Sequence, residues 1–174
     1  MTRQENWLEK RFTFDFPVSR YPGFIQYLKQ TPDTLTALVS GLPAETLIRR
    51  DGEAWSIQEN AGHFLSVEEL FLGRLDDYAH HAEILRPADF ADNRTDKAHY
   101  NTQDLAQILA AFRQQRGVYI ARLEALAPAD FAQVALHPRL DSLMRLCDML
   151  HFHAEHDRHH LERIVELKEL WGVS

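Results

Sequence analysis

The C-terminal part of the chain reads DSLMRLCDMLHFHAEHDRHHLERIVELKELW over residues 141–171. Its apolar residues recur at spacings of three, four and seven, and they are Leu143, Leu146, Leu150, Leu161, Ile164, Leu167 and Trp171. This period is typical of the buried face of an amphipathic helix. Asp141 is a suitable N-terminal cap and Gly172 a suitable stop. The stretch therefore predicts one long helix over residues 141–171.

Three other segments show the same period, over residues 23–40, 56–80 and 102–127. The helix at 56–80 has the clearest start, because Ser56 and Glu59 match the Ser-x-x-Glu pattern of a capping box. Thr102 suits the start of the helix at 102–127, and Pro32 should kink or restart the first helix. Since no stretch alternates in the manner of a strand, the fold class is all-α. We expect four antiparallel helices, a four-helix bundle, in a single domain spanning residues 1–174.

The connector at residues 83–101 is polar and longer than most loops between helices. Segments of that length without regular structure are uncommon in small domains. We therefore expect the connector to carry a short helix or to line a site.

The composition is that of a globular protein, with 45% hydrophobic residues and a formal net charge of −7. Without a basic cluster, this charge argues against a nucleic-acid partner. No apolar run approaches the roughly 18 residues of a membrane helix, so we expect no membrane partner. The single cysteine, Cys147, cannot form an internal disulfide, and the charged N-terminus lacks the apolar core of a signal peptide. These features favour a cytoplasmic protein.

Histidines crowd the last predicted helix, with five of the ten in the chain between His151 and His160. Neutral imidazole is a common ligand of transition metals. His156 and His160 are spaced i, i+4, so they share a helix face and could bind one ion. Periodicity alone leaves His153 with His160, or His153 with Asp157, open as the pair. Two ligands are too few, and a third must come from another helix.

Two motifs resemble signatures of the DinB and YfiT-like family. WSIQENAGHFLSVEE, over residues 55–69, resembles a Trp-Ser-x-x-Glu segment that leads into a helix with a metal-binding histidine. HDRHHLERI, over residues 156–164, resembles a His-x-x-x-His motif on the last helix. The resemblance covers most of the chain and implies a DinB/YfiT-like four-helix bundle that forms a homodimer. It also implies that His63, His156 and His160 bind a divalent transition metal, often nickel, zinc or iron.

The resemblance further implies a metal-dependent enzyme of the thiol S-transferase or hydrolase type. Such an enzyme activates a low-molecular-weight thiol, such as bacillithiol or mycothiol, or else water, for attack on an electrophilic small molecule. Three neutral imidazoles leave the charge of the ion uncompensated and a coordination position open, as catalytic sites require. The alternative is a non-catalytic metal-binding bundle with a stress or interaction role. A di-iron carboxylate site is disfavoured, because the sequence lacks paired Glu-x-x-His motifs.

Three further residues are candidates for supporting roles at the site. Glu59 could orient His63 or act as a base, although we favour its use as a cap. Asp157 lies on the core-facing stripe, so it should hydrogen-bond an imidazole or pair with an arginine. His153 is either a core histidine or a pocket residue. Cys147 should be a buried, inert thiol. We expect four histidines at the surface: His80, His81, His99 and His137.

Overall fold

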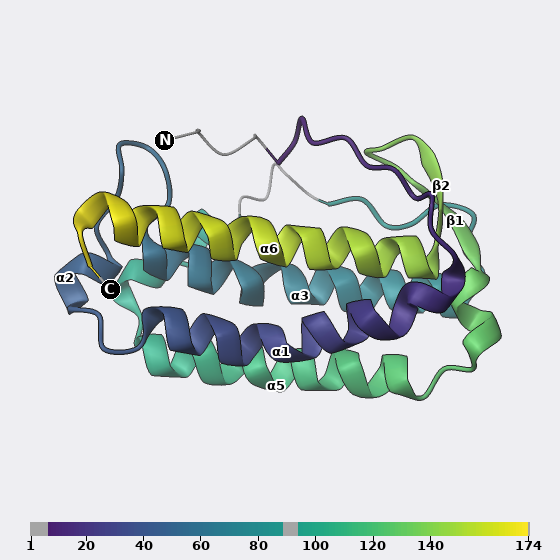
Figure 1. The fold of residues 1–174 in the computed structure, drawn as a ribbon, viewed down its shortest axis with the longest axis horizontal. Coiled ribbons are helices and arrows are strands. Elements are labelled where there is room, and N and C mark those ends of the chain that lie inside the picture. Colours follow the sequence, from purple (N-terminus) through teal and green to yellow (C-terminus); the bar gives the residue numbers. More distant parts are fainter. Residues whose placement is uncertain (1–6, 89–93, 174) are drawn as a thin grey trace.

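The computed structural model describes residues 7–88 and 94–173. Within them, the chain forms a bundle of long helices (Figure 1), which are α1 (Tyr21–Val39), α3 (Ile57–Ala79), α5 (Leu105–Glu124) and α6 (Leu146–Trp171). Five short helical elements also occur in the described residues: η1 (Val18–Arg20) precedes α1, and the connections hold α2 (Ala44–Leu47), α4 (Arg94–Lys97), η2 (Tyr100–Thr102) and η3 (Pro128–Ala132). The predicted four-helix bundle is confirmed, and the connector carries two of the short helices, α4 and η2, as expected.

The helices are not antiparallel throughout. Helix α1 packs against α5 and α6, and α3 packs against the same two helices. In Figure 1 the colour gradient shows α1 and α6 running in one direction and α3 and α5 in the other. Neighbours α1 and α6 are therefore parallel, as are α3 and α5, so the expectation of antiparallel packing was wrong. Because α3 and α5 are consecutive and parallel, the connection between them must return along the length of the bundle, which explains why it is long.

The last two long helices begin later than predicted. Helix α5 begins three residues later than predicted, because Thr102 belongs to η2 and the Asp104 carboxylate accepts the Gln107 N–H at 2.9 Å. Helix α6 begins at Leu146, since Asp141 lies in a turn with a φ of 47°. The capping box of Ser56 and Glu59 is confirmed at the start of α3.

A short hairpin replaces the predicted first turn of the last helix. Strand β1 (Val134–His137) pairs antiparallel with β2 (Ser142–Arg145). Each strand has only four residues, too few for alternation to register as a pattern. The all-α prediction therefore holds for the bundle and misses this element.

Pro32 neither ends nor restarts α1, which continues to Val39. A proline inside a helix has no N–H to donate to the carbonyl four residues before it, here that of Leu28. Arg116 Nη1 donates to the Leu28 oxygen instead, at 2.9 Å. A side chain of α5 thus satisfies the carbonyl that Pro32 leaves without its helical donor.

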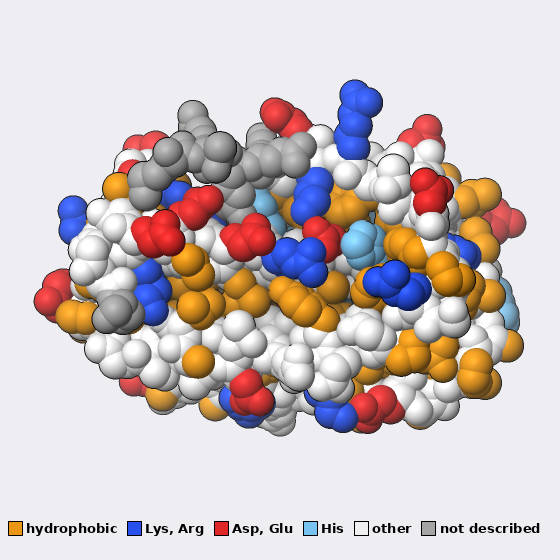
Figure 2. All heavy atoms as spheres, in the orientation of Figure 1, with side chains coloured by type: hydrophobic (Ala, Val, Ile, Leu, Met, Phe, Trp, Pro, Cys, Tyr) orange, Lys and Arg blue, Asp and Glu red, His pale blue; other side chains and the backbone are white. Residues whose placement is uncertain are grey.

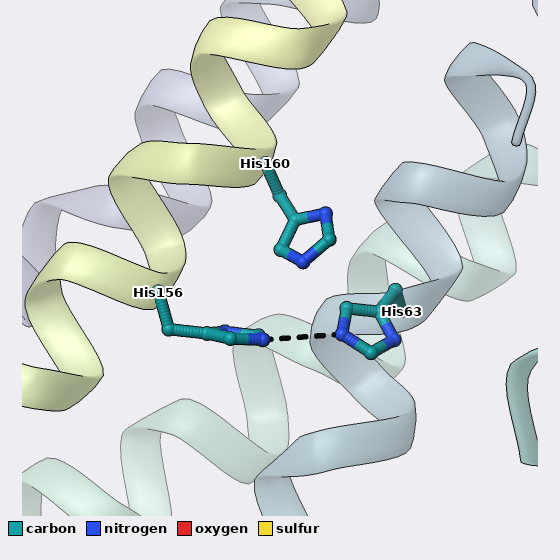
Figure 3. Close-up of side chains that lie close together, drawn as sticks. All are labelled: His63, His156 and His160. Carbon is teal, nitrogen blue, oxygen red and sulfur yellow. Dashed lines mark hydrogen bonds between the residues drawn. The ribbon is translucent and has the colours of Figure 1, made fainter. Parts of the chain in front are cut away.

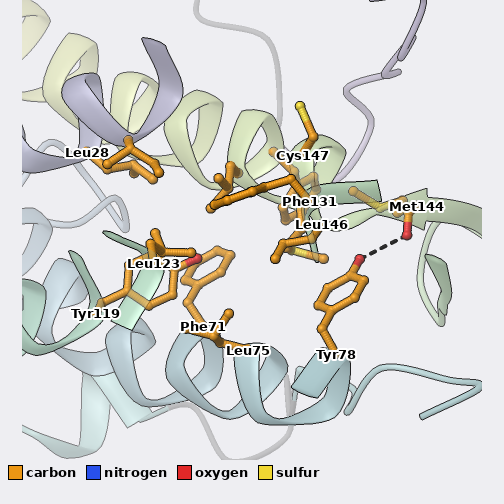
Figure 4. Close-up of a cluster of buried hydrophobic side chains, with 14 of the residues drawn as sticks. Leu28, Phe71, Leu75, Tyr78, Tyr119, Leu123, Phe131, Met144, Leu146 and Cys147 are labelled. Carbon is orange, nitrogen blue, oxygen red and sulfur yellow. Dashed lines mark hydrogen bonds between the residues drawn. The ribbon is translucent and has the colours of Figure 1, made fainter. Parts of the chain in front are cut away.

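Two apolar clusters fill the bundle, one toward each end. Figure 4 shows the larger, where the Tyr78 hydroxyl donates to the Met144 carbonyl at 3.0 Å and so ties α3 to β2. Cys147 belongs to this cluster, and burial raises the pKa of its thiol to about 11, in keeping with an inert residue. Between the clusters lies a layer of buried polar side chains, Glu68, Arg116, His153 and Asp157.

The surface view in Figure 2 shows acidic and basic side chains interspersed along the middle of one face, with apolar side chains gathered toward the hairpin end. Leu143 on β2 and Val134 on β1 are among the exposed large apolar residues. None of the helices in the described part of the chain is both long and apolar enough to cross a membrane.

Candidate metal centre

Three imidazoles from two helices meet on one side of the bundle. His63 comes from the second turn of α3, and His156 and His160 come from successive turns of α6 (Figure 3). One ring nitrogen from each lies within 4.8 Å of the others, and the Nε2 atoms of His63 and His156 are 3.1 Å apart. Two nitrogen ligands of a tetrahedral zinc ion lie about 3.4 Å apart, so this spacing suits a shared ion. Among the described residues, no other group of histidine, cysteine or carboxylate side chains meets in this way.

Burial keeps these imidazoles neutral. His156 and His160 are 6% and 7% exposed, and His63 is partly exposed. Burial lowers the pKa of His63 to about 3, with a smaller contribution from His159. Burial, followed by the neighbouring histidines, also holds the pKa values of His156 and His160 well below their ordinary range. A cation that enters at neutral pH would therefore meet unprotonated nitrogens.

Asn60 fixes the tautomer of His160. The Asn60 Nδ2 group donates to the carbonyls of Ser56 at 2.8 Å and Trp55 at 3.2 Å, which turns its Oδ1 toward His160 Nδ1 at 3.0 Å. Because Oδ1 only accepts hydrogen bonds, the His160 proton lies on Nδ1. The lone pair of Nε2 remains available to a metal, as in other metal-bound histidines.

The connector supports His63 from the other side. Thr95 on α4 is buried, and its Oγ1 lies 2.8 Å from His63 Nδ1. Trp55 covers the same imidazole with a ring separation of 4.7 Å, and its Nε1 donates to Asp96 at 2.8 Å. The connector therefore lines the site, as its length indicated. Nothing in the sequence identified Thr95 or Asn60, since neither belongs to a pattern visible before the helices are docked.

The structure gives Glu59 a structural partner. Its carboxylate accepts the Ser56 N–H at 2.9 Å and the Arg50 Nε–H at 2.8 Å. Burial favours the protonated form, but these hydrogen bonds outweigh it and lower the pKa of Glu59. The carboxylate is thus engaged in capping α3 and binding Arg50.

Asp157 and His153 belong to the polar layer and lie outside the histidine cluster. Arg116 Nη1 donates to Asp157 at 2.7 Å, which confirms the expected arginine partner. His153 Nε2 lies 3.0 Å from Arg116 Nη2, and its ring stacks on Phe71 at a centroid separation of 3.5 Å. His153 is therefore a core residue, and it is His156 that lies beside His63.

The histidine cluster opens onto a cavity of about 350 Å³. Its walls are mostly aromatic and aliphatic, and they include Trp7, Trp55, Val67, Leu70, Phe71 and Phe152. A second cavity of about 310 Å³ shares His63 and several of these walls and extends along the connector. All three imidazoles line the first cavity.

The fold and the site define a class: a helical bundle with a three-histidine cluster held between two of its helices. The sequence model of the DinB superfamily matches residues 27–164, so the chain belongs to this superfamily. No curated protein matches the sequence. The solved structure of YfiT from Bacillus subtilis is 22% identical and superposes with a TM-score of 0.81 over 95% of each chain. YfiT is described as "a probable metal-dependent hydrolase with an unusual four-helix bundle topology", and the likeness shows that the two share a fold.

Proposed function

We propose that this protein is a metal-dependent enzyme that activates water, or else a low-molecular-weight thiol, for attack on an electrophilic small molecule. One observation carries the proposal: three neutral imidazoles, from His63, His156 and His160, meet at the wall of a cavity of about 350 Å³. The description of YfiT as a probable metal-dependent hydrolase supports water as the first choice.

The residues present fit a divalent transition metal. Asn60 leaves the Nε2 lone pair of His160 free, and burial keeps the cluster unprotonated at neutral pH. An all-imidazole donor set suits nickel, zinc and iron. Such an ion, held by three neutral ligands, keeps its full charge and an open position, and so supplies Lewis acidity to a bound nucleophile or electrophile.

The side chains around the cluster orient the ligands and exclude water. Thr95 and Asn60 hold the imidazoles of His63 and His160 in place, as outer hydrogen-bond partners do in metal sites. Trp55 and Phe71 are apolar walls that limit the access of solvent. Glu59 and Asp157 already bind arginines, so neither is free to serve as the general base.

Metal analysis of protein purified without a histidine tag tests the metal site. We expect close to one divalent ion per chain after reconstitution, and loss of that ion in His156→Ala. His151→Ala is the matched control, because His151 lies on the same helix and packs against Phe24 instead of the cluster. A wild-type protein that retains no metal would contradict the proposal.

The spectrum of the cobalt-substituted protein separates catalysis from simple metal storage. Addition of 2-mercaptoethanol or azide should shift the visible bands, because an open position accepts a new ligand. The metal-loaded protein should also hydrolyse p-nitrophenyl esters faster than His156→Ala. If cobalt binds but neither small ligand alters the spectrum, the protein is a non-catalytic metal-binding bundle and the enzymatic proposal fails.

A further inference from the structure

The cavity has a second end that the histidine cluster does not explain. Three basic side chains, Arg74, His137 and Arg139, line it together with the cluster and the aromatic walls. We call these three residues the basic end. Phe152 lies between the two ends, with ring separations of 5.0 Å from His137 and 5.1 Å from Trp7, whose own ring is 5.1 Å from His156.

His137 presents a buried donor to this space. Although the sequence predicted a surface residue, its side chain is 1% exposed, because the hairpin turns it inward against Phe152. Its Nδ1 accepts the Leu140 N–H at 3.3 Å, so the ring proton lies on Nε2. That Nε2 is buried and has no hydrogen-bond partner in the described part of the chain.

Arg139 presents a second buried donor. Its Nη1 donates to the carbonyls of Leu8 at 3.3 Å and Trp7 at 3.5 Å, which anchors the guanidinium. Its Nη2 is buried, and no described residue accepts a hydrogen bond from it. Nearly all buried polar groups in proteins find a partner, so two orphaned donors lining one cavity indicate a missing ligand.

The basic end carries positive charge that no described carboxylate pairs with directly, since Asp77, which acts on Arg74 at longer range, already pairs with Arg86. Arg74 is 2% exposed, and its Nε donates to the Arg86 carbonyl at 3.2 Å. Its guanidinium lies over Phe71 at 5.9 Å, and that of Arg139 lies over Phe152 at 5.5 Å. Burial lowers the pKa of Arg74 to about 10, and burial with these two arginines lowers the pKa of His137 to about 3. Within residues 7–88 and 94–173, neither Arg74 nor Arg139 forms an ion pair, so an anionic group would relieve an unfavourable burial.

We infer that the basic end binds the carboxylate of the substrate, whose apolar body lies along Trp7, Phe71 and Phe152 and whose reactive group reaches the histidine cluster. A carboxylate fits because it brings a negative charge and two acceptor oxygens to a cavity lined by two donors without a partner, His137 Nε2 and Arg139 Nη2. The placement of the reactive group rests on the proposed function. The carboxylate site itself does not, since no metal ligand belongs to it.

Calorimetric titration of the metal-free protein with 3-phenylpropanoate and its neutral twin, 3-phenylpropanamide, tests the carboxylate site. The two probes have the same apolar body, so a difference in affinity reports the charge. We expect the acid to bind at least tenfold more tightly than the amide at pH 7.5. Arg139→Met should reduce that preference below twofold. Arg113→Met is the matched control, because Arg113 is exposed and already pairs with Asp33 at 2.7 Å.

A second readout needs no variant and so remains valid if Arg139→Met fails to fold. In protein labelled with ¹⁵N-histidine, the acid should shift the His137 Nε2–H resonance, and the amide should not. Equal affinities for the two probes, no binding of the acid at millimolar concentration, or a folded Arg139→Met that keeps the preference would overturn the inference. Failure of the proposed function would appear separately, as absence of metal in the analysis above.

Discussion

Asn60 and Thr95 determine how two of the three imidazoles face the candidate metal position. Each contacts the Nδ1 of its histidine, Asn60 at 3.0 Å from His160 and Thr95 at 2.8 Å from His63. Both hydrogen bonds hold the ring orientation before a metal arrives, and the Asn60 oxygen, which can only accept, also fixes the tautomer of His160. His156 lacks such a partner among the described residues and is held by its ring contacts with Trp7 and Phe71.

We predict that Thr95→Val weakens metal binding by about 10- to 100-fold, the usual cost of losing an outer hydrogen-bond partner. Valine has nearly the shape of threonine, so the fold should be retained while His63 loses its partner. Competition with a chromogenic chelator measures the affinity. Thr34→Val is the control, because its exposed hydroxyl bonds only to the Gln30 carbonyl. Equal affinities in Thr95→Val and wild type would show that packing alone orients His63.

We predict that His137 makes the metal-free protein less stable in acid. Its pKa is about 3 in the fold, where burial and the nearby arginines disfavour its charge, and about 6.5 when unfolded. The unfolded state therefore binds the extra proton as the pH falls below about 6.5, and stability declines from there toward pH 3. When the pH is lowered from 7 to 5, the unfolding free energy of both proteins should fall. The fall should be about 1–2 kcal/mol smaller in His137→Gln than in wild type. Urea unfolding of both proteins at the two pH values measures the two falls. Equal falls in wild type and His137→Gln would contradict the prediction.

Sequence spacing showed that His156 and His160 share a helix face, because they are i, i+4 neighbours, but it left pairs that include His153 open, and the family resemblance selected His156. His63 came only from the family resemblance, since no local pattern links residues on different helices. Thr95 and His137 could not be placed, because their burial depends on how the connector and the hairpin dock. The metal itself remains a prediction.

At the scale of elements, helix interiors were predictable and helix ends were not. The period of apolar residues fixes an interior over many turns, whereas an end depends on one cap, and Thr102 and Asp104 are both capable caps. Leu143 continues the apolar stripe of α6 in the sequence, but it lies in β2 of the hairpin and not in the helix. Tertiary contacts such as the bond from Tyr78 to Met144 decide between strand and helix.

Close contact between α3 and η2 depends on Gly62. A Cβ at this position would overlap the ring of Tyr100, whose hydroxyl bonds to Ser66 at 2.8 Å. We predict that Gly62→Ala costs about 1–3 kcal/mol of unfolding free energy, the usual range for overpacking. It should also weaken metal binding, because displacing η2 disturbs the adjoining α4 and its Thr95.

Gly117→Ala is the matched control for that prediction. Gly117 is also in a long helix, and a Cβ there meets nothing within 4 Å. Replacement should raise the unfolding free energy by about 0.5–1 kcal/mol, because alanine loses less backbone entropy on folding. Thermal unfolding and chelator competition measure both variants. Gly62→Ala with unchanged stability and metal affinity would mean that η2 tolerates displacement.

At the scale of the whole molecule, Arg116 joins all four long helices. From α5 it bonds the Leu28 carbonyl of α1 at 2.9 Å, Glu68 of α3 at 2.8 Å and Asp157 of α6 at 2.7 Å. Burial raises the pKa values of both carboxylates, and Arg116 opposes that shift. The layer therefore holds two buried acids whose charge depends on one cation.

We predict that Arg116→Met lowers the unfolding free energy by about 3–5 kcal/mol, because it leaves these acids uncompensated. Without the cation, the folded-state pKa values of Glu68 and Asp157 rise further above their unfolded values. At low pH the two acids are protonated in the folded variant, and this protonation stabilises it. That stabilisation is lost as the pH rises, so the unfolding free energy of Arg116→Met should fall further below that of wild type at pH 8 than at pH 5. Urea unfolding at the two pH values tests this. A deficit that does not depend on pH would show that lost packing, and not charge, is the cause.

Metal binding should stabilise the whole bundle, because the cluster exists only when α3 and α6 are docked. A ligand specific for the folded state adds RT ln(1 + [L]/Kd), about 2.7 kcal/mol at a hundredfold excess over Kd. For a chain of this size the melting temperature should rise by about 5–10 °C with nickel or zinc and return on chelation. His160→Ala should lose the rise, and Arg139→Met should keep it, because Arg139 lies at the basic end of the cavity. Calorimetry that shows an equal rise in His160→Ala would place the stabilising ion elsewhere and contradict the three-histidine site.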